Sequence, residues 1–222
     1  MMTTSNHPPA AQPAPDRIAY WADRLVLGVA RHWLALFSLA LFLYVGVPFL
    51  APVLMKLGLT TPARIIYTIY MPACHQLPDR SYFLFGEKPV YTLSELEADN
   101  VLPGTSILER RRYIGDETLG WKVALCERDV AIWGSMFLLG FVFLLLGRRV
   151  RPLSMWGFAL FLVPIAVDGL SQLVGLRTST WWLRTITGAL FGTGIVWLAY
   201  PHIEIAMREI RQSTEKKLAR QN

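Results

Sequence analysis

The chain has 222 residues and a formal net charge of +6, with 53% hydrophobic and only 17% charged residues. Soluble domains carry about 25% charged residues, so this composition points to a lipid environment and argues against a large soluble helical protein. Basic residues beside lipid-spanning segments explain the positive charge, and no nucleic-acid partner is predicted.

The chain begins with a segment rich in proline and alanine, MMTTSNHPPAAQPAPD at 1–16. This segment lacks the basic start of a cleavable signal peptide, and it is predicted to be a disordered N-terminus. The next stretch, 17–32, places arginines at seven-residue intervals beside an apolar side that includes Trp21 and Leu25. This pattern predicts an interfacial amphipathic helix on anionic lipid, and the alternative is a simple extension of the first span.

Four runs that are almost free of charge follow, at 33–55, 130–147, 152–176 and 185–203, and Asp168 is their one charged residue. A helix needs about 20 apolar residues to cross a hydrocarbon core of about 30 Å. The sequence therefore predicts an all-α, multi-pass integral membrane bundle of four transmembrane helices, with a membrane domain over 33–204.

The distribution of lysine and arginine predicts the orientation of these spans. The side that carries both termini has eleven Lys and Arg residues against five Asp and Glu residues, whereas the other side is balanced. Basic residues flanking spans favour the cytoplasmic side. Both termini, including a basic tail over 205–222, are therefore predicted to be cytoplasmic in the cell (inner) membrane, with lipid as the expected partner and the oligomeric state left open.

The segment 56–122 between the first two spans is too long for a simple connection. It is predicted to form an extracytoplasmic loop domain that contains a short helix over 63–70. A second short helix is expected near Ser94, which has capping-box spacing to Glu97.

Several polar residues are predicted to lie at one depth, near the extracytoplasmic surface. Asp168 lies sixteen residues after Pro152, or about 24 Å along a helix, and intramembrane acids are normally paired or functional. The alternative to a functional site is a structural salt bridge from Asp168 to Arg177 or Arg184. The predicted ligand pocket consists of Arg80, Asp168, Gln172, Arg177, Arg184 and Thr187.

The two cysteines are predicted to lie on the same side of the membrane as this pocket. Asp129 follows Cys126 by one helical turn, and His75 follows Cys74 directly. Together Cys74, His75, Cys126 and Asp129 offer sulfur, nitrogen and oxygen ligands suited to zinc. A Cys74–Cys126 disulfide and a pair of inert thiols are the alternatives.

These short motifs resemble a family of bacterial and archaeal membrane proteins catalogued as domain of unknown function 2085. The resemblance rests on CHQLPDRS at 74–81, CERD at 126–129, DGLSQ at 168–172, RTS at 177–179 and RTITG at 184–188. Asp129 stands where the family commonly has a second cysteine, which favours a metal site over thiol exchange, because aspartate is still a ligand. The resemblance implies a membrane fold and no activity.

The sequence contains no GxSxG, P-loop, HExxH or dinucleotide-binding motif, so it assigns no standard enzyme class. The leading hypothesis is an outward-facing polar pocket that binds a metal ion or small ligand. The alternatives are an outward-facing membrane enzyme that acts on a lipid-linked or periplasmic substrate, with Asp168 as acid or base, and a structural or assembly subunit of a membrane complex.

Overall fold

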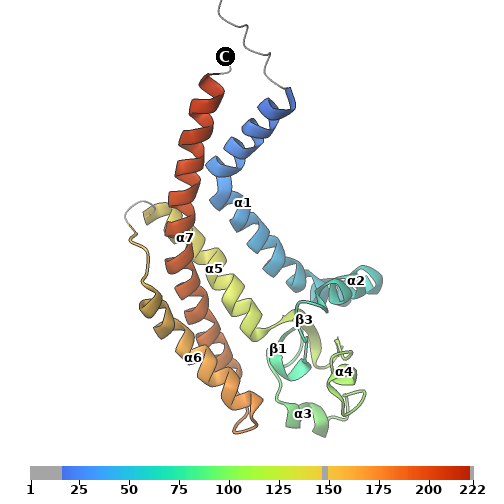
Figure 1. Ribbon diagram of the computed structural model, residues 1–222. Helices are drawn as coiled ribbons and strands as arrows, with labels where there is room; N and C mark the ends of the chain where they lie inside the picture. The colour runs from blue at the N-terminus through green and yellow to red at the C-terminus, as the bar shows by residue number, and fades with distance from the viewer. Residues whose placement is uncertain (1–16, 147–149, 221–222) are drawn as a thin grey trace, which may run out of the picture. The chain divides into compact units, whose positions relative to one another are not determined.

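The computed structural model describes residues 17–146 and 150–220, and the predicted disordered segment 1–16 lies outside them. Within these described residues, four helices are long and apolar enough to cross a membrane: α1 (Arg17–Lys56), α5 (Glu127–Leu146), α6 (Met155–Leu173) and α7 (Trp181–Ala219) (Figure 1). The predicted all-α membrane bundle with four spans is confirmed.

The helices extend beyond the uncharged runs in two places. α1 also contains the predicted helix 17–32, and its backbone leaves helical geometry at His32 (φ −117°, ψ 16°), next to the expected start of the first span. α7 continues past Pro201 into the basic tail, because helical hydrogen bonding does not require apolar side chains. The predicted position of residues 17–32 at a membrane interface stays a prediction.

The chain divides into two compact units, and the first contains residues 17–33 and 204–220 of the described chain. Ion pairs join its two helical segments, with Arg31 bonded to Glu215 at 2.8 Å and Lys217 to Asp23 at 2.7 Å. The Trp33 indole also donates a hydrogen bond to Glu204 at 2.9 Å. This unit is therefore held together by polar contacts as well as by packing.

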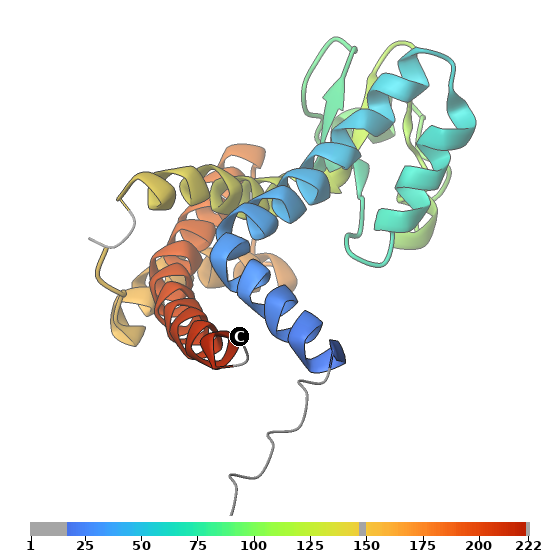
Figure 2. The same cartoon turned by 90° about the horizontal axis from the view of Figure 1, so that it is seen from above.

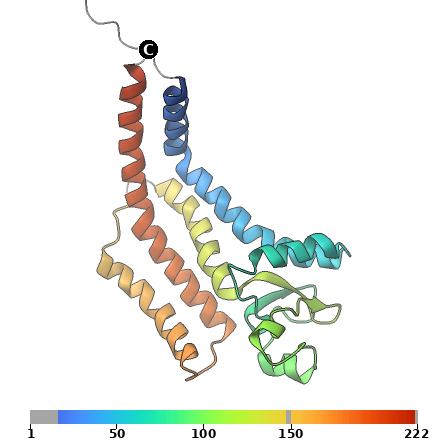
Figure 3. The same ribbon diagram turned by 45° about the vertical axis from the view of Figure 1, so that its right-hand side comes forward.

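The second unit, residues 34–203, contains α5, α6 and the part of α7 up to Ile203 as neighbouring helices (Figure 3). Glycines let them approach closely. A methyl group added at Gly192 of α7 would lie 2.6 Å from the Ile132 carbonyl oxygen of α5, and one at Gly194 would lie 2.6 Å from Phe161 of α6. Such distances are too short for any larger side chain, so these positions require glycine for tight helix packing.

The segment between α1 and α5 contains a three-stranded antiparallel sheet that the sequence analysis does not predict. The strands are β1 (Ser81–Leu84), β2 (Gly115–Asp116) and β3 (Gly120–Cys126), in the order β1-β3-β2. Ser81 pairs with Cys126 and Phe83 with Lys122. Figure 2 shows the sheet and α2 gathered at the Lys56 end of α1. The pairing of Cys126 with Ser81 therefore holds the backbone in place directly before α5 begins.

Short helices cover this sheet: α2 (Thr60–Tyr70), the 3-10 turn η1 (Pro78–Arg80), α3 (Leu93–Ala98) and α4 (Ile107–Arg110). The N-cap residue of α3 lies two residues before the predicted one. Thr92 and Glu95, not Ser94 and Glu97, cap it reciprocally. The sequence TLSELE contains the Ser/Thr-x-x-Glu spacing twice, and Glu95 is also bonded to Lys88 at 2.8 Å, which favours the earlier register.

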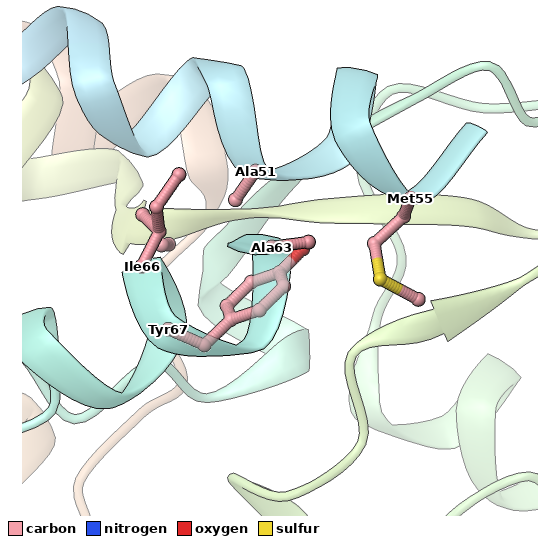
Figure 4. Packing of buried hydrophobic residues seen from close by; sticks show 6 residues of the cluster. Ala51, Met55, Ala63, Ile66 and Tyr67 are labelled. Atoms are coloured by element: carbon pink, nitrogen blue, oxygen red, sulfur yellow. The ribbon is translucent and has the colours of Figure 1, made fainter. Parts of the chain in front are cut away.

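A small hydrophobic core attaches this segment to the first span (Figure 4). Ala51 and Met55 of α1 pack against Ala63, Ile66 and Tyr67 of α2, together with Ala124 of β3. The Tyr67 hydroxyl donates a hydrogen bond to the Lys122 carbonyl oxygen of β3. This packing fixes the sheet, and therefore Cys126, relative to the end of the span.

Candidate functional site

The structure brings Cys74, Cys126 and Asp129 together in what we call the thiol cluster. Their ligand atoms, two sulfurs and a carboxylate oxygen, all lie within 4.8 Å of one another. Cys74 follows α2, Cys126 ends β3, and Asp129 lies in the first turn of α5. The two cysteines are fifty-two positions apart in the sequence, and the fold brings them together beside Asp129.

The backbone at the start of α5 orients both sulfurs. The Cys126 N–H group donates to the Cys74 sulfur at 3.2 Å, and the Asp129 N–H group donates to the Cys126 sulfur at 3.5 Å. Cys126 thus occupies the position of an N-cap residue, where the helix dipole favours negative charge. These two backbone hydrogen bonds hold the sulfur atoms close to each other.

The two thiols differ in acidity. A hydrogen bond donated by the Cys126 thiol lowers the pKa of Cys74 below its ordinary value. The same hydrogen bond, together with burial, raises the pKa of Cys126. Cys74 is therefore the more acidic of the two thiols, and both cysteines are free thiols in the structure.

His75, the fourth residue of the predicted metal set, is not part of this cluster. Its side chain is exposed, whereas its neighbours Cys74 and Gln76 are buried. Gln76 has a positive φ of 51°, and its amide donates to the Tyr67 carbonyl oxygen at 2.8 Å. This turn keeps Cys74 and Gln76 inside and places the histidine between them at the surface.

Asp168 of α6 is fully buried and is bonded to two arginines. One is Arg177, at 2.8 Å, as the structural alternative predicted. The other is Arg128 of α5, which the sequence analysis did not consider. The predicted partner Arg184 is not bonded to Asp168, so the pairing ties α6 to α5 and to the turn that precedes α7.

Arg184 of α7 instead forms a buried ion pair with Glu127, the first residue of α5, at 3.0 Å. The same guanidinium group donates to the carbonyl oxygens of Asp79 at 3.1 Å and Ser179 at 2.8 Å. Both side chains of the pair are at most 7% exposed. This contact joins α5, α7 and the turn η1.

A cavity of about 890 Å³, which we call the polar cavity, lies beside this ion pair. Four of the six residues predicted to form a ligand pocket line it. Asp168 lies outside the lining, and so does Thr187, whose buried hydroxyl donates to the Leu183 carbonyl oxygen of its own helix at 2.8 Å. The predicted residues that line the cavity are Arg80, Gln172, Arg177 and Arg184, and the unpredicted ones include Asp79, Tyr91, Glu127 and Trp181.

Lys122 of β3 is a further buried charge that sequence reasoning missed. It is fully buried, and its ammonium group donates to the carbonyl oxygens of Gln76 at 2.6 Å and Arg111 at 2.7 Å. Burial lowers the pKa of Lys122 to about 7. The sequence signal that could have indicated its burial is its position in the largely apolar segment GWKVALC at 120–126.

The comparison with known families matches the second half of this site. Residues 117–198 match the model of a family described as "Predicted membrane protein (DUF2085)". The predicted resemblance is confirmed. The DUF2085 match contains every site residue from Cys126 to Thr187, whereas Cys74 and Arg80 precede it. The family description states a membrane location and no activity.

A similar protein comes from Methanocaldococcus jannaschii, where it is described as the uncharacterized protein MJ1492. The two chains are 27% identical over 179 residues, which cover 77% of this chain and 92% of the relative. The similarity therefore extends well beyond the DUF2085 match. No solved structure matches the chain.

Proposed function

We propose that this membrane protein binds a zinc ion through the thiol cluster of Cys74, Cys126 and Asp129. The observation that carries the proposal is the convergence of two sulfurs and a carboxylate oxygen within 4.8 Å. Zinc binds cysteine sulfur at about 2.3 Å and carboxylate oxygen at about 2.0–2.2 Å. The ligand atoms of one tetrahedral zinc ion lie somewhat closer to one another than 4.8 Å. Small side-chain rotations would bring these three atoms to that separation.

The chemistry of the three ligands supports a transition metal. Thiolates select zinc and similar soft or borderline ions over magnesium and calcium. The hydrogen bond from Cys126 lowers the pKa of Cys74, which eases the loss of the proton that a metal-binding thiol must give up. Three protein ligands leave the fourth tetrahedral position to water or to an external ligand, which is the arrangement of zinc sites that act as Lewis acids.

The proposal also places the thiol cluster on the extracytoplasmic side of the cell membrane, with both termini in the cytoplasm. The excess of basic residues on the terminal side supports this orientation. A reporter that is active only in the cytoplasm should be active when fused after Asn222 and inactive when inserted at Glu117, an exposed loop position. The opposite pattern would invert the orientation and leave zinc binding untouched.

Zinc content of the purified full-length protein tests the metal proposal directly. We expect about one zinc per chain after loading. Cys74→Ser and Asp129→Asn should each weaken zinc binding more than about 100-fold, because loss of an outer-sphere partner alone typically costs 10–100-fold. Zinc would be measured by elemental mass spectrometry against a competing chelator.

His75→Ala is the matched control, because His75 adjoins Cys74 and its side chain is exposed outside the thiol cluster. It should keep the zinc affinity of the unmodified protein. The proposal fails if the reduced protein takes up no zinc, or if intact-mass analysis finds a Cys74–Cys126 disulfide in freshly isolated protein that resists zinc loading. Loss of zinc in His75→Ala would contradict the assigned ligand set.

A further inference from the structure

The polar cavity is built by three parts of the second unit. One part of the lining comes from residues 79–80, 90–95 and 97 of the sheet segment, another from the first residue of α5, and the third from the end of α6 through the start of α7. Its volume of about 890 Å³ suits a small organic ligand or a lipid headgroup, since such pockets measure about 300–1,000 Å³.

The ion pairs formed by the arginines of the lining and by their neighbours carry a surplus positive charge. Asp79 is paired with Arg80 at 3.4 Å, and Glu127 with Arg184 at 3.0 Å. The third carboxylate of this network, that of Asp168, is shared by two arginines. Four arginines therefore share three carboxylates, so this network carries one net positive charge, although Asp168 and Arg128 themselves lie outside the lining.

The two glutamates on the opposite wall do not balance this charge. Glu95 is bonded to Lys88 at 2.8 Å, and Glu97 to Arg110 at 3.0 Å. Each of these glutamates is therefore neutralised by a cation that does not line the cavity. When the lining residues are counted together with the residues bonded to them, the net charge is therefore +1, and it arises from the two arginines that share Asp168.

Unused hydrogen-bond donors accompany the surplus charge. Within residues 17–146 and 150–220, the Gln172 amide nitrogen is buried without a partner, and so is the Nε of Arg184, whose residue is only 6% exposed. In the same described residues, the terminal nitrogens of Arg80 form no hydrogen bond, since only its Nε contacts Asp79. Buried donors without acceptors are costly, and a ligand with several acceptor oxygens would satisfy them.

We infer that the polar cavity binds a phosphate group. A carboxylate offers two oxygens, whereas a phosphate offers three or four to donors that come from several directions, and the arginine fork matches phosphate geometry. The phosphate could belong to a soluble ester or to a lipid, since the half-exposed Trp181 on the cavity wall begins a candidate span. This inference does not depend on zinc binding, because it uses none of the thiol cluster.

The test uses full-length protein purified without phosphate. In one arm, inorganic phosphate is titrated in detergent and the shift of the unfolding temperature is compared with that in sodium chloride of equal ionic strength. In the other arm, the protein is placed in phosphatidylcholine nanodiscs with a minor fraction of phosphatidic acid, and retained lipid is identified by native mass spectrometry. The variants are Arg80→Gln and Arg177→Gln.

Each of these variants should weaken phosphate binding about ten-fold or more, as expected for loss of one charge-assisted hydrogen bond. Arg112→Gln is the matched control, because Arg112 is an exposed arginine of the same segment and lies outside the cavity. Arg80→Gln removes only a 3.4 Å contact with a neighbouring residue, so it should fold normally.

Saturable stabilisation by inorganic phosphate that both variants weaken would support a soluble phosphate ligand. Retention of phosphatidic acid that both variants abolish would support a lipid headgroup. The inference is overturned if neither probe binds saturably, or if Arg112→Gln weakens binding as much as Arg80→Gln does. Zinc content measured on the same samples separates this result from that of the metal proposal.

Discussion

Glu127→Gln should lower the free energy of unfolding by about 3–5 kcal/mol, because it leaves the Arg184 guanidinium buried without its counter-charge. Both partners are at most 7% exposed, and Arg184 also holds the Asp79 carbonyl oxygen of the sheet segment. Arg184→Gln should cost a similar amount for the same reason. Reversible unfolding in detergent micelles would measure both changes.

The double variant, with both residues replaced by glutamine, should recover part of the loss, because neither charge is then left alone. Glu117→Gln is the control, since Glu117 forms an exposed ion pair with Lys56 in which its side chain is 80% exposed. Such a surface pair contributes about 0–1 kcal/mol. Equal losses in Glu117→Gln and Glu127→Gln would contradict the buried ion pair.

The second large effect is a pH dependence that Lys122 creates. Its folded-state pKa is about 7, against an ordinary value of 10.5, mainly because of burial. The charge of Arg111 also lowers this pKa, whereas Cys74 and Asp79 raise it. Between these two pH values the unfolded chain binds a proton that the folded chain does not. Stability should therefore rise with pH over this window, by up to about 1.4 kcal/mol per pH unit.

Lys122→Met removes this titration, so the difference in unfolding free energy between the unmodified protein and the variant should grow from pH 7 to pH 10. The measurement uses metal-free protein in detergent. Lys56→Met, at an exposed lysine, should keep the slope of the unmodified protein. A slope that survives in Lys122→Met would assign the titration to another group.

The helical spans were predictable because lipid solubility is a local property of the sequence. Each uncharged run is long enough to cross a bilayer by itself, so no knowledge of its neighbours is needed. The ends of the helices were less predictable. α7 continues for sixteen residues beyond the expected boundary at 203, because its charged C-terminal segment is stabilised by ion pairs with the distant residues Asp23 and Arg31.

The three-stranded sheet was missed because strand pairing is not local. β1 and β3 are separated by two short helices, and the register that sets Ser81 opposite Cys126 leaves no mark in either segment alone. β3 is buried on both faces over much of its length, so it lacks the alternation that identifies a half-exposed strand.

The site was predicted in part for the same reason. Cys126 lies near Asp129 as expected, although it ends a strand and not a helical turn, and Asp168 is bonded to Arg177, one of the two expected partners. Spacing could not show that Glu127 and Arg128, inside the quoted motif CERD, are bonded to residues of α7 and α6. It also could not show that the turn at Gln76 leaves His75 exposed.

The motif CERD at 126–129 contributes residues to both proposed sites. Cys126 and Asp129 belong to the thiol cluster. Glu127 and Arg128, which lie between them in the sequence, form ion pairs with Arg184 and Asp168 near the polar cavity. Cys126 ends β3 and the other three residues begin the first turn of α5, so the two sites share one continuous stretch of backbone. Thermodynamic linkage makes any coupling between the two sites reciprocal: the factor by which zinc alters anion affinity equals the factor by which the anion alters zinc affinity.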